Sequence, residues 1–252
     1  MQTPLRHYDC VSRKDHHMSI KAVLFDLDGT LLPMDQNQFV KAYFQLLAVK
    51  LAPRGYEPKQ LVDAIWAGTA AMVKNTGRQS NEAAFWEKFT EIYGEKAKED
   101  LPLFEEFYRQ EFAGAKAACG FNSKAAETIA LVKEKELRVA LATNPIFPAV
   151  ATESRIRWAG LEPEDFELYT TYENARYCKP NLRYYQDIVD QMDLRPEECM
   201  MVGNDVAEDM VVQALGMQVF LLTDCLINSE QKDISAYPNG GFPELLSLIH
   251  SL

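Results

Sequence analysis

Short apolar runs that end in polar residues recur along this chain and alternate with helical patterns. Such runs occupy residues 22–25, 137–142, 200–202 and 218–222, with a shorter strand expected at 167–171. Helical patterns follow at 123–134, up to Trp158 before Gly160, at 183–192, up to Leu215 and at 242–252. Strands that alternate with helices are typical of a parallel sheet covered on both faces. The sequence therefore predicts an α/β fold with a doubly wound parallel sheet.

Two carboxylates follow the first of these runs. Asp26 and Asp28 stand two residues apart in the segment FDLDGT, which begins at Phe25. Open α/β sheets bind ligands at the carboxyl ends of their strands, so both acids are expected at that edge. Gly29 lets the chain turn sharply and bring backbone N–H groups close to an anion. Taken alone, the segment also fits an ordinary Asp-Gly turn.

Three later segments make the simple turn a poorer explanation. Thr143 follows the run at 137–142, Lys179 stands before a proline, and the run at 200–202 opens into the acidic segment GNDVAED, residues 203–209. Together with the earlier Asp-x-Asp-Gly-Thr segment, and in the order in which they follow it along the chain, these segments resemble the motifs of the haloacid dehalogenase-like superfamily. The resemblance extends from about residue 22 to about residue 222. It is to the phosphatase branch with a helical cap after the first motif, similar to phosphoglycolate phosphatases, and implies a Rossmann-like core.

The residue types in these motifs suit aspartyl-phosphate chemistry, which requires a carboxylate nucleophile, a cation and donors for the phosphoryl oxygens. Asp26 is the expected nucleophile. Asp28 is expected to protonate the leaving alkoxide and later to deprotonate the attacking water. Thr143 would donate to phosphoryl oxygens and Lys179 would supply positive charge. Substrate binding is assigned to the residues Gly29, Thr143, Asn144 and Lys179.

Clustered carboxylates next to a phosphate need a cation, because like charges about 4 Å apart repel by about 4 kcal/mol at an effective dielectric near 20. Oxygen ligands from Asp26, Asp205 and the backbone carbonyl of Asp28 suit Mg²⁺. Asp209 is assigned to a water-mediated metal contact or to orienting the lysine, with Glu208 as a possible substitute. The simpler alternative is that these two acids favour a helix N-terminus. The commonest family pattern has an acid directly after the glycine, where this chain has Asn204.

Long amphipathic patterns separate the first motif from the second and predict a helical cap domain at residues 34–120. The core would then comprise residues 19–33 and 121–252, and residues 1–18 would form an N-terminal tail. One helix carries apolar residues from Phe39 to Leu51, and a second begins at Pro58. A third is expected to be capped by Asn81 and stopped by Gly94, and a fourth to run from about residue 103 to 112.

The cap would close over the site and select the substrate, as the resemblance implies. Its aromatic residues are expected to form the core of the cap. Lys74, Asn75 and Arg78 lie in a polar break between two helices and are candidates to face an anionic leaving group. The alternative for them is an ordinary solvated loop.

Composition restricts the partners. The chain has 252 residues, of which 47% are hydrophobic and 25% charged, enough for a full core and a second small domain. The net charge of −11 argues against nucleic acid. No segment approaches the roughly 18 apolar residues of a membrane span. Five scattered cysteines favour reduced thiols over a disulfide framework or a zinc site. We therefore expect a cytoplasmic protein, a monomer or small homo-oligomer, that acts on a small phosphorylated metabolite.

The tail is polar and aperiodic. Metal binding by His16 and His17 is disfavoured because adjacent residues rarely face one ion without further ligands. Met18 is a possible natural start.

These observations predict a Mg²⁺-dependent phosphatase that hydrolyses a small phosphate monoester through an aspartyl-phosphate. Dehalogenation is disfavoured, since that chemistry does without the second acid, Asp28. Two alternatives stay open. One is a phosphomutase that transfers the phosphoryl group between sugar hydroxyls, and the other is a phosphate-binding or interaction module with little turnover. Phosphoglycolate, sugar phosphates and nucleotides all fit as substrates.

Overall fold

The computed structural model describes residues 19–252. The expectations for the tail, including His16, His17 and Met18, lie outside the described residues. The predicted doubly wound sheet is confirmed: the described residues form a six-stranded parallel sheet in the order β3-β2-β1-β4-β5-β6. The strands are β1 (Ala22–Phe25), β2 (Arg138–Leu141), β3 (Leu168–Tyr169), β4 (Cys199–Gly203), β5 (Gln218–Leu222) and β6 (Asn239–Gly240). The short strand β6 was not predicted.

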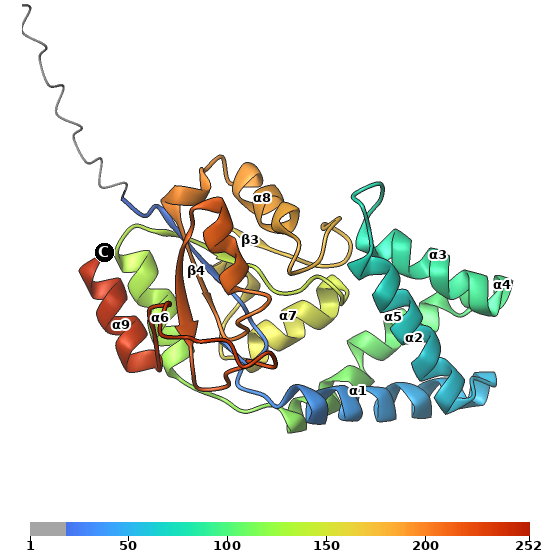
Figure 1. The fold of residues 1–252 in the computed structure, drawn as a ribbon. Helices are drawn as coiled ribbons and strands as arrows, with labels where there is room; N and C mark the ends of the chain where they lie inside the picture. Colours follow the sequence, from blue (N-terminus) through green and yellow to red (C-terminus); the bar gives the residue numbers. More distant parts are fainter. Residues whose placement is uncertain (1–18) are drawn as a thin grey trace, which may run out of the picture.

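Alternate residues of each strand bury on opposite faces of the sheet. On β1, Val23 and Phe25 pack into one core with helices α6 (Lys124–Glu134), α7 (Ala149–Trp158) and α9 (Phe242–Ser251). Ala22 and Leu24 pack into a second core with α8 (Leu182–Gln191) and the 3₁₀ helix η5 (Met210–Leu215). Because side chains alternate along a strand, a fully apolar strand such as β1 requires cover on both faces. Figure 1 shows α6 and α9 together on one side of the sheet.

Helices inserted between β1 and β2 form a separate lobe beside the sheet (Figure 1). They are α1 (Gln36–Leu51), η1 (Ala52–Arg54), α2 (Pro58–Val73), α3 (Asn81–Tyr93), α4 (Glu95–Glu99), α5 (Leu101–Arg109) and η2 (Glu111–Ala118). The predicted first and second helices and the stop at Gly94 are confirmed. The predicted fourth helix is wrong in extent, because α5 ends at Arg109 and Phe112 lies in η2. The segment before Leu215 is likewise a 3₁₀ helix with no α-helical turn.

Asn81 does not cap α3. The capping side chain is that of Ser80, which accepts a hydrogen bond from the Ala83 N–H. Asn81 is the first helical residue and is fully buried. Its Nδ2 donates to the carbonyls of Pro145 and Tyr177 in the core, at 3.2 and 3.3 Å. The residue predicted as a helix cap therefore ties the helical lobe to the sheet domain.

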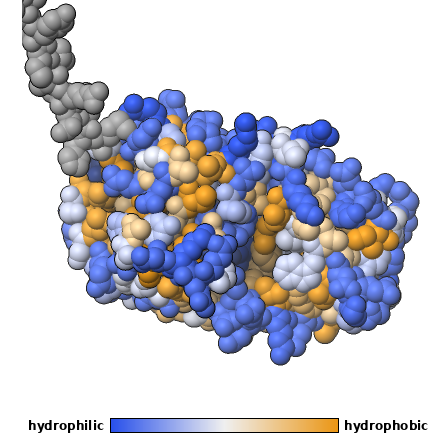
Figure 2. Space-filling model, in the orientation of Figure 1, coloured by the Kyte–Doolittle hydropathy of each residue, from blue (hydrophilic) through white to orange (hydrophobic). Residues whose placement is uncertain are grey.

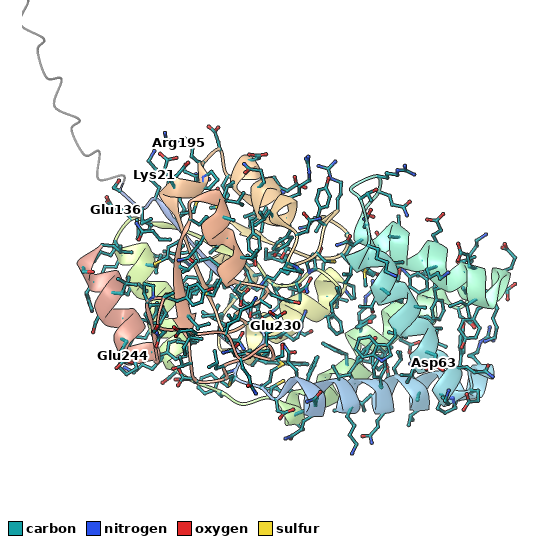
Figure 3. The ribbon with its side chains drawn as sticks, viewed as in Figure 1. Lys21, Asp63, Glu136, Arg195, Glu230 and Glu244 are labelled. Atoms are coloured by element: carbon teal, nitrogen blue, oxygen red, sulfur yellow. The ribbon has the colours of Figure 1, made fainter. Side chains whose placement is uncertain are left out.

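Charged groups at the amino ends of the strands form a separate structural cluster. Glu198, directly before β4, accepts contacts from Lys21 at 2.8 Å and Arg195 at 3.0 Å. Figure 3 shows Lys21 and Arg195 at the same end of the molecule, away from the helical lobe. The two ends of the sheet thus differ, with structural ion pairs at the amino ends and the predicted site residues at the carboxyl ends.

Among the described residues, no helix is long and apolar enough to cross a membrane.

Candidate active site

The predicted site residues meet where three neighbouring strands end. Asp26 directly follows β1, and its N–H donates to the Val202 carbonyl of β4 at 2.9 Å. The Ala142 N–H donates to the Phe25 carbonyl at 2.7 Å, which places Thr143 beside the end of β1. The parallel register of β1 with β2 and β4 therefore brings these residues to one edge, although they are far apart in the sequence.

Lys179 joins two of the predicted acids. Its Nζ lies 2.8 Å from Asp26 Oδ1 and 2.6 Å from Asp209 Oδ1, and the lysine is 2% exposed. Burial disfavours the charged amine, but the two carboxylates outweigh it and raise the pKa of Lys179 well above its usual value. Burial also raises the pKa of Asp209, to about 7, whereas Lys179 lowers it. The short contacts to two acids favour the ion pair at neutral pH, since a protonated lysine compensates both.

A glycine allows this arrangement. A Cβ on Gly203 would lie 2.1 Å from Asp209 Oδ2, so a larger residue there would displace the acid. Asp209 Oδ2 also accepts the Asp205 N–H at 3.0 Å. Asp209 is therefore fixed by Lys179 and by its own turn. Of its two predicted roles, the structure supports orienting the lysine.

Thr30 and Asn204 belong to the site, although no role was predicted for either. The Thr30 hydroxyl lies 3.0 Å from both Asp26 Oδ2 and Asn204 Oδ1, so it links the amide to the expected nucleophile. Asn204 Nδ2 donates to the Cys225 carbonyl at 2.7 Å. Gly29 has φ +87° and passes close to Asn204, where a Cβ would lie 2.3 Å from Nδ2. Its own N–H donates to the Leu32 carbonyl at 2.8 Å.

Asp28 is paired with an arginine that was not predicted. Arg155 of α7 is 1% exposed and forms a charged hydrogen bond to Asp28 Oδ2. Its guanidinium also donates to the Thr152 hydroxyl at 3.2 Å and lies over the Phe147 ring, 4.6 Å from the centroid. Burial raises the pKa of Asp28, and Arg155 opposes that shift. The ion pair fixes the direction of the predicted acid–base residue.

The backbone carbonyl of Thr143 accepts hydrogen bonds from the Thr170 and Tyr184 hydroxyls, each at 2.7 Å, which fix the position of this residue. Asn144 Nδ2 lies 3.2 and 3.3 Å from the two carboxylate oxygens of Glu208. Burial raises the pKa of Glu208, and the nearby Lys179 lowers it. Thr143 and Asn144 both line the cavity described next, as predicted for substrate-binding residues.

A cavity of about 240 Å³ opens above these residues, between the strand ends and the helical lobe. It is lined by the predicted acids Asp26, Asp28, Asp205 and Asp209 and by aromatic and apolar residues of α1, α2 and the loop after β2. Figure 2 shows the hollow between the two lobes, with apolar residues along it. Lys74, Asn75 and Arg78 line a different surface groove. Their predicted contact with the leaving group is therefore wrong for this arrangement of the lobes.

The oxygen atoms around the cavity suit a hard cation. Asp28 Oδ1 and Asn144 Oδ1 are buried acceptors that have no hydrogen-bond partner. Asp205 Oδ1 accepts the N–H groups of Ala207 and Glu208, whereas Asn204 Oδ1 lies 3.0 Å from the Thr30 hydroxyl. Within residues 19–252, no group of three or more His, Cys, Asp or Glu side chains is arranged to hold an ion. A metal here would thus depend on neutral oxygens and water as well as carboxylates, which suits Mg²⁺.

The chain belongs to the haloacid dehalogenase-like hydrolases, whose family model matches residues 20–212. It is similar to the pyrophosphatase PpaX of Bacillus cereus, with 23% identity over 188 residues, 75% of this chain and 76% of the relative. The core and inserted helical lobe are the architecture of this family.

Solved structures share the fold at low identity. A 2-haloacid dehalogenase from Pseudomonas syringae is 18% identical, with a TM-score of 0.59 and 92% and 98% of the two chains covered. A predicted phosphoglycolate phosphatase from Haemophilus somnus is 16% identical, with a TM-score of 0.54 and 91% and 97% covered. YfnB from Bacillus subtilis, solved bound to magnesium, is 15% identical, with a TM-score of 0.52 and 92% and 99% covered. Phosphatases and dehalogenases thus share this fold, so the site residues must carry the functional argument.

Proposed function

We propose that this hydrolase is a Mg²⁺-dependent phosphatase that cleaves a small phosphate monoester through an aspartyl-phosphate at Asp26. The buried Lys179, bonded to Asp26 and Asp209, which both line the cavity, carries the proposal. A lysine in that position neutralises both the nucleophile and a phosphoryl group. Asp28 supports the phosphatase over the dehalogenase, because protonating an alkoxide requires a second acid.

Asp26 acts as the nucleophile, and Asp28 acts as an acid in the first half-reaction and as a base in the second. An Asp26 oxygen attacks phosphorus while the bond from phosphorus to the ester oxygen breaks, and Asp28 gives its proton to that oxygen as the alcohol leaves. Asp28, now a carboxylate, takes a proton from water as the water oxygen attacks the phospho-aspartate. Inorganic phosphate leaves and Asp26 is regenerated. The Arg155 contact keeps Asp28 directed and favours the ionised form that the second half-reaction needs.

The metal would be held by Asp26, Asp205 and the Asp28 carbonyl, and the position of Asn204 makes its amide oxygen a further candidate ligand. Mg²⁺ bound there supplies Lewis-acid charge for the phosphoryl oxygens. Asp205→Asn should weaken Mg²⁺ binding, as should Asn204→Ala if the amide is a ligand. Calorimetric titration of Mg²⁺ measures both without reference to turnover. Unchanged affinity in a folded Asp205→Asn variant would remove that residue from the ligand set.

The first experiment is phosphate release from a panel of monoesters with and without Mg²⁺, comparing the intact chain with Asp26→Asn. Mg²⁺-dependent release that the variant loses, with phospho-enzyme trapped only in the intact chain, is the expected result. Asp63→Asn is a matched control, because Asp63 is exposed on α2 of the helical lobe (Figure 3) and does not line the cavity. Appreciable turnover by Asp26→Asn would rule out covalent catalysis at that residue. Phosphoryl transfer to a second sugar hydroxyl in preference to water would indicate a mutase, and turnover no better than background would indicate a binding module.

A further inference from the structure

The catalytic cavity continues into a second, almost wholly apolar cavity inside the helical lobe. This aromatic pocket has a volume of about 60 Å³ and lies among α1, α2, α3 and the loop after β2. Val40, Trp66, Ile146 and Phe147 line both cavities, so they form the junction between them. Trp66 is 49% exposed although it is a large aromatic residue. Space next to the reacting phosphoryl group is where a leaving group would lie.

Among residues 19–252, no basic side chain lines either cavity to pair with a second anionic group on the substrate. The residues that line them include no lysine or arginine, and the catalytic cavity already contains five acids. Arg155 is buried and bonded to Asp28 and Thr152. A carboxylate or second phosphate on the substrate would therefore meet carboxylates and rings without a basic side chain to pair with. This disfavours phosphoglycolate and pyrophosphate as substrates.

Most hydroxyls of the aromatic pocket are already paired, and among the described residues that line it the one buried donor without a partner is Trp86 Nε1. The Tyr43 and Tyr108 hydroxyls bond to each other at 2.9 Å, and the Thr69 hydroxyl donates to the Ile65 carbonyl at 2.9 Å. A sugar would leave most of its hydroxyls unpaired against these walls, whereas a ring or branched hydrocarbon would gain from leaving water.

We propose that the substrate is a phosphate monoester of an aromatic or branched apolar alcohol, an inference that depends on the phosphatase function proposed above. The phosphoryl group lies at Asp26 and the hydrocarbon lies at the junction lined by Val40, Trp66 and Phe147. The aromatic pocket alone is smaller than the cavity of about 150 Å³ that holds benzene in a protein core. The ring therefore occupies the junction, with only its far edge inside the pocket.

Benzyl phosphate and ethyl phosphate test this directly, because both release unactivated primary alcohols and neither carries a charged group besides the phosphate. We expect Mg²⁺-dependent kcat/KM to be at least about tenfold higher for benzyl phosphate, and phosphoglycolate to be poorer than ethyl phosphate. Equal or better use of ethyl phosphate or phosphoglycolate, lost in Asp26→Asn, would overturn the apolar leaving group and leave the phosphatase intact. No turnover of any monoester would instead refute the phosphatase, and this inference with it.

Variants of α2 locate the leaving group. Trp66→Ala removes a wall of the junction and should lower the benzyl-to-ethyl ratio of kcat/KM by about tenfold. Val73→Ala is the matched control, because Val73 is 47% exposed on the same helix and lines neither cavity. Thr69→Phe fills the aromatic pocket and should lower the same ratio even if Trp66→Ala fails to fold. An unchanged ratio in a variant with normal thermal unfolding would place the leaving group elsewhere.

Discussion

At the scale of single residues, the site depends on how each carboxylate is paired. Asp26 is bonded to Lys179 and Thr30, Asp209 to Lys179, and Asp28 to Arg155. Charges buried together are tolerated only when each has a partner with good geometry. The pairing also separates the functions of Asp26 and Asp28, which lie two residues apart, because Asp26 faces an ammonium group and Asp28 a guanidinium group. Arg155 is therefore as much a part of the site as the motif residues.

Removing that guanidinium should impair catalysis more than substrate binding. We expect Arg155→Met to lower kcat by about a hundredfold with little change in KM, because a misdirected Asp28 no longer reaches the ester oxygen. Arg155→Lys should recover only part of the rate, since an ammonium lacks the planar fork of the guanidinium. Steady-state kinetics on folded variants measures both effects. Arg157→Met, in an exposed position two residues along α7, is the control. A normal kcat in Arg155→Met would show that Asp28 needs no orienting partner.

Sequence reasoning found the motif acids but missed Arg155 for a physical reason. Asp26 and Thr143 directly follow apolar runs, and the acids at 205–209 follow another, so strand register brings them to one edge, whereas Lys179 was found by its place in the motif order. Arg155 reaches Asp28 from a helix, across 127 positions of the chain. One signal was present: Ala151, Arg155 and Ala159 recur at four-residue spacing, and both alanines are fully buried. An arginine in a buried helical stripe needs an acidic partner, which the sequence does not identify.

At the scale of elements, the connection between α3 and the core is the least expected feature. Asn81 donates to the core carbonyls of Pro145 and Tyr177 and accepts from Asn75. The N–H groups of Asn81 and Glu82 also donate across the lobes, to the carbonyls of Ala175 and Tyr172, each at 2.8 Å. The sequence predicted a cap at this point because asparagine is a good capping residue. The neighbouring serine takes that role, which leaves the asparagine free to hold the lobes together.

The two neighbours should therefore respond differently to alanine. Asn81→Ala should lower the free energy of unfolding by about 2 kcal/mol, because it leaves buried carbonyls without a donor. Ser80→Ala should cost about 1 kcal/mol, the usual value for a lost helix cap. Urea unfolding measures both, and limited proteolysis should cut the helical lobe faster only in Asn81→Ala. Equal costs and equal cleavage would argue against a tie between the lobes.

A second element-level prediction concerns acid stability. Burial opposes ionisation of Asp100, but hydrogen bonds from Arg54 and Lys96 outweigh it and lower the pKa of Asp100 from 3.8. A carboxyl with a lowered native pKa adds stability above its unfolded pKa and loses it as pH falls through the native value. Asp100→Asn should thus lower the free energy of unfolding by about 2 kcal/mol at pH 7. The difference in this free energy between the variant and the intact chain should become smaller below about pH 4.

Urea unfolding at several pH values between 3 and 7 measures that gap. Asp63→Asn is the control, since its exposed pair with Lys59 should contribute less than about 1 kcal/mol at any pH. A gap for Asp100→Asn that stayed constant down to pH 3 would show that the carboxyl is not the group lost in acid.

At the scale of the whole molecule, the sequence predicted the sheet and the inserted helices more securely than the way the two lobes meet. Apolar runs of four or five residues and helical spacing are local signals, and β1 and β5 lie where they were expected. The aromatic pocket depends on side chains from α1, α2, α3 and the loop after β2 facing one another. Local patterns mark these residues as apolar but do not say that space remains between them. The candidates for facing the leaving group were therefore sought in the polar loop, at Lys74, Asn75 and Arg78, which do not line the catalytic cavity.

The net negative charge of the molecule should slow the approach of an anionic substrate. The chain carries a net charge of −11, and the residues that line the catalytic cavity include no lysine or arginine. Long-range repulsion of an anionic monoester weakens with salt, because the screening length falls from about 30 Å at 0.01 M to about 8 Å at 0.15 M. At saturating Mg²⁺, kcat/KM should rise about threefold over that range while kcat stays constant, since a bound substrate no longer has to approach. Comparing NaCl with KCl controls for specific ion effects. A kcat/KM that falls with salt would reveal a basic approach path. Compounds with a second anionic group besides the phosphate would then be the better candidates for the substrate.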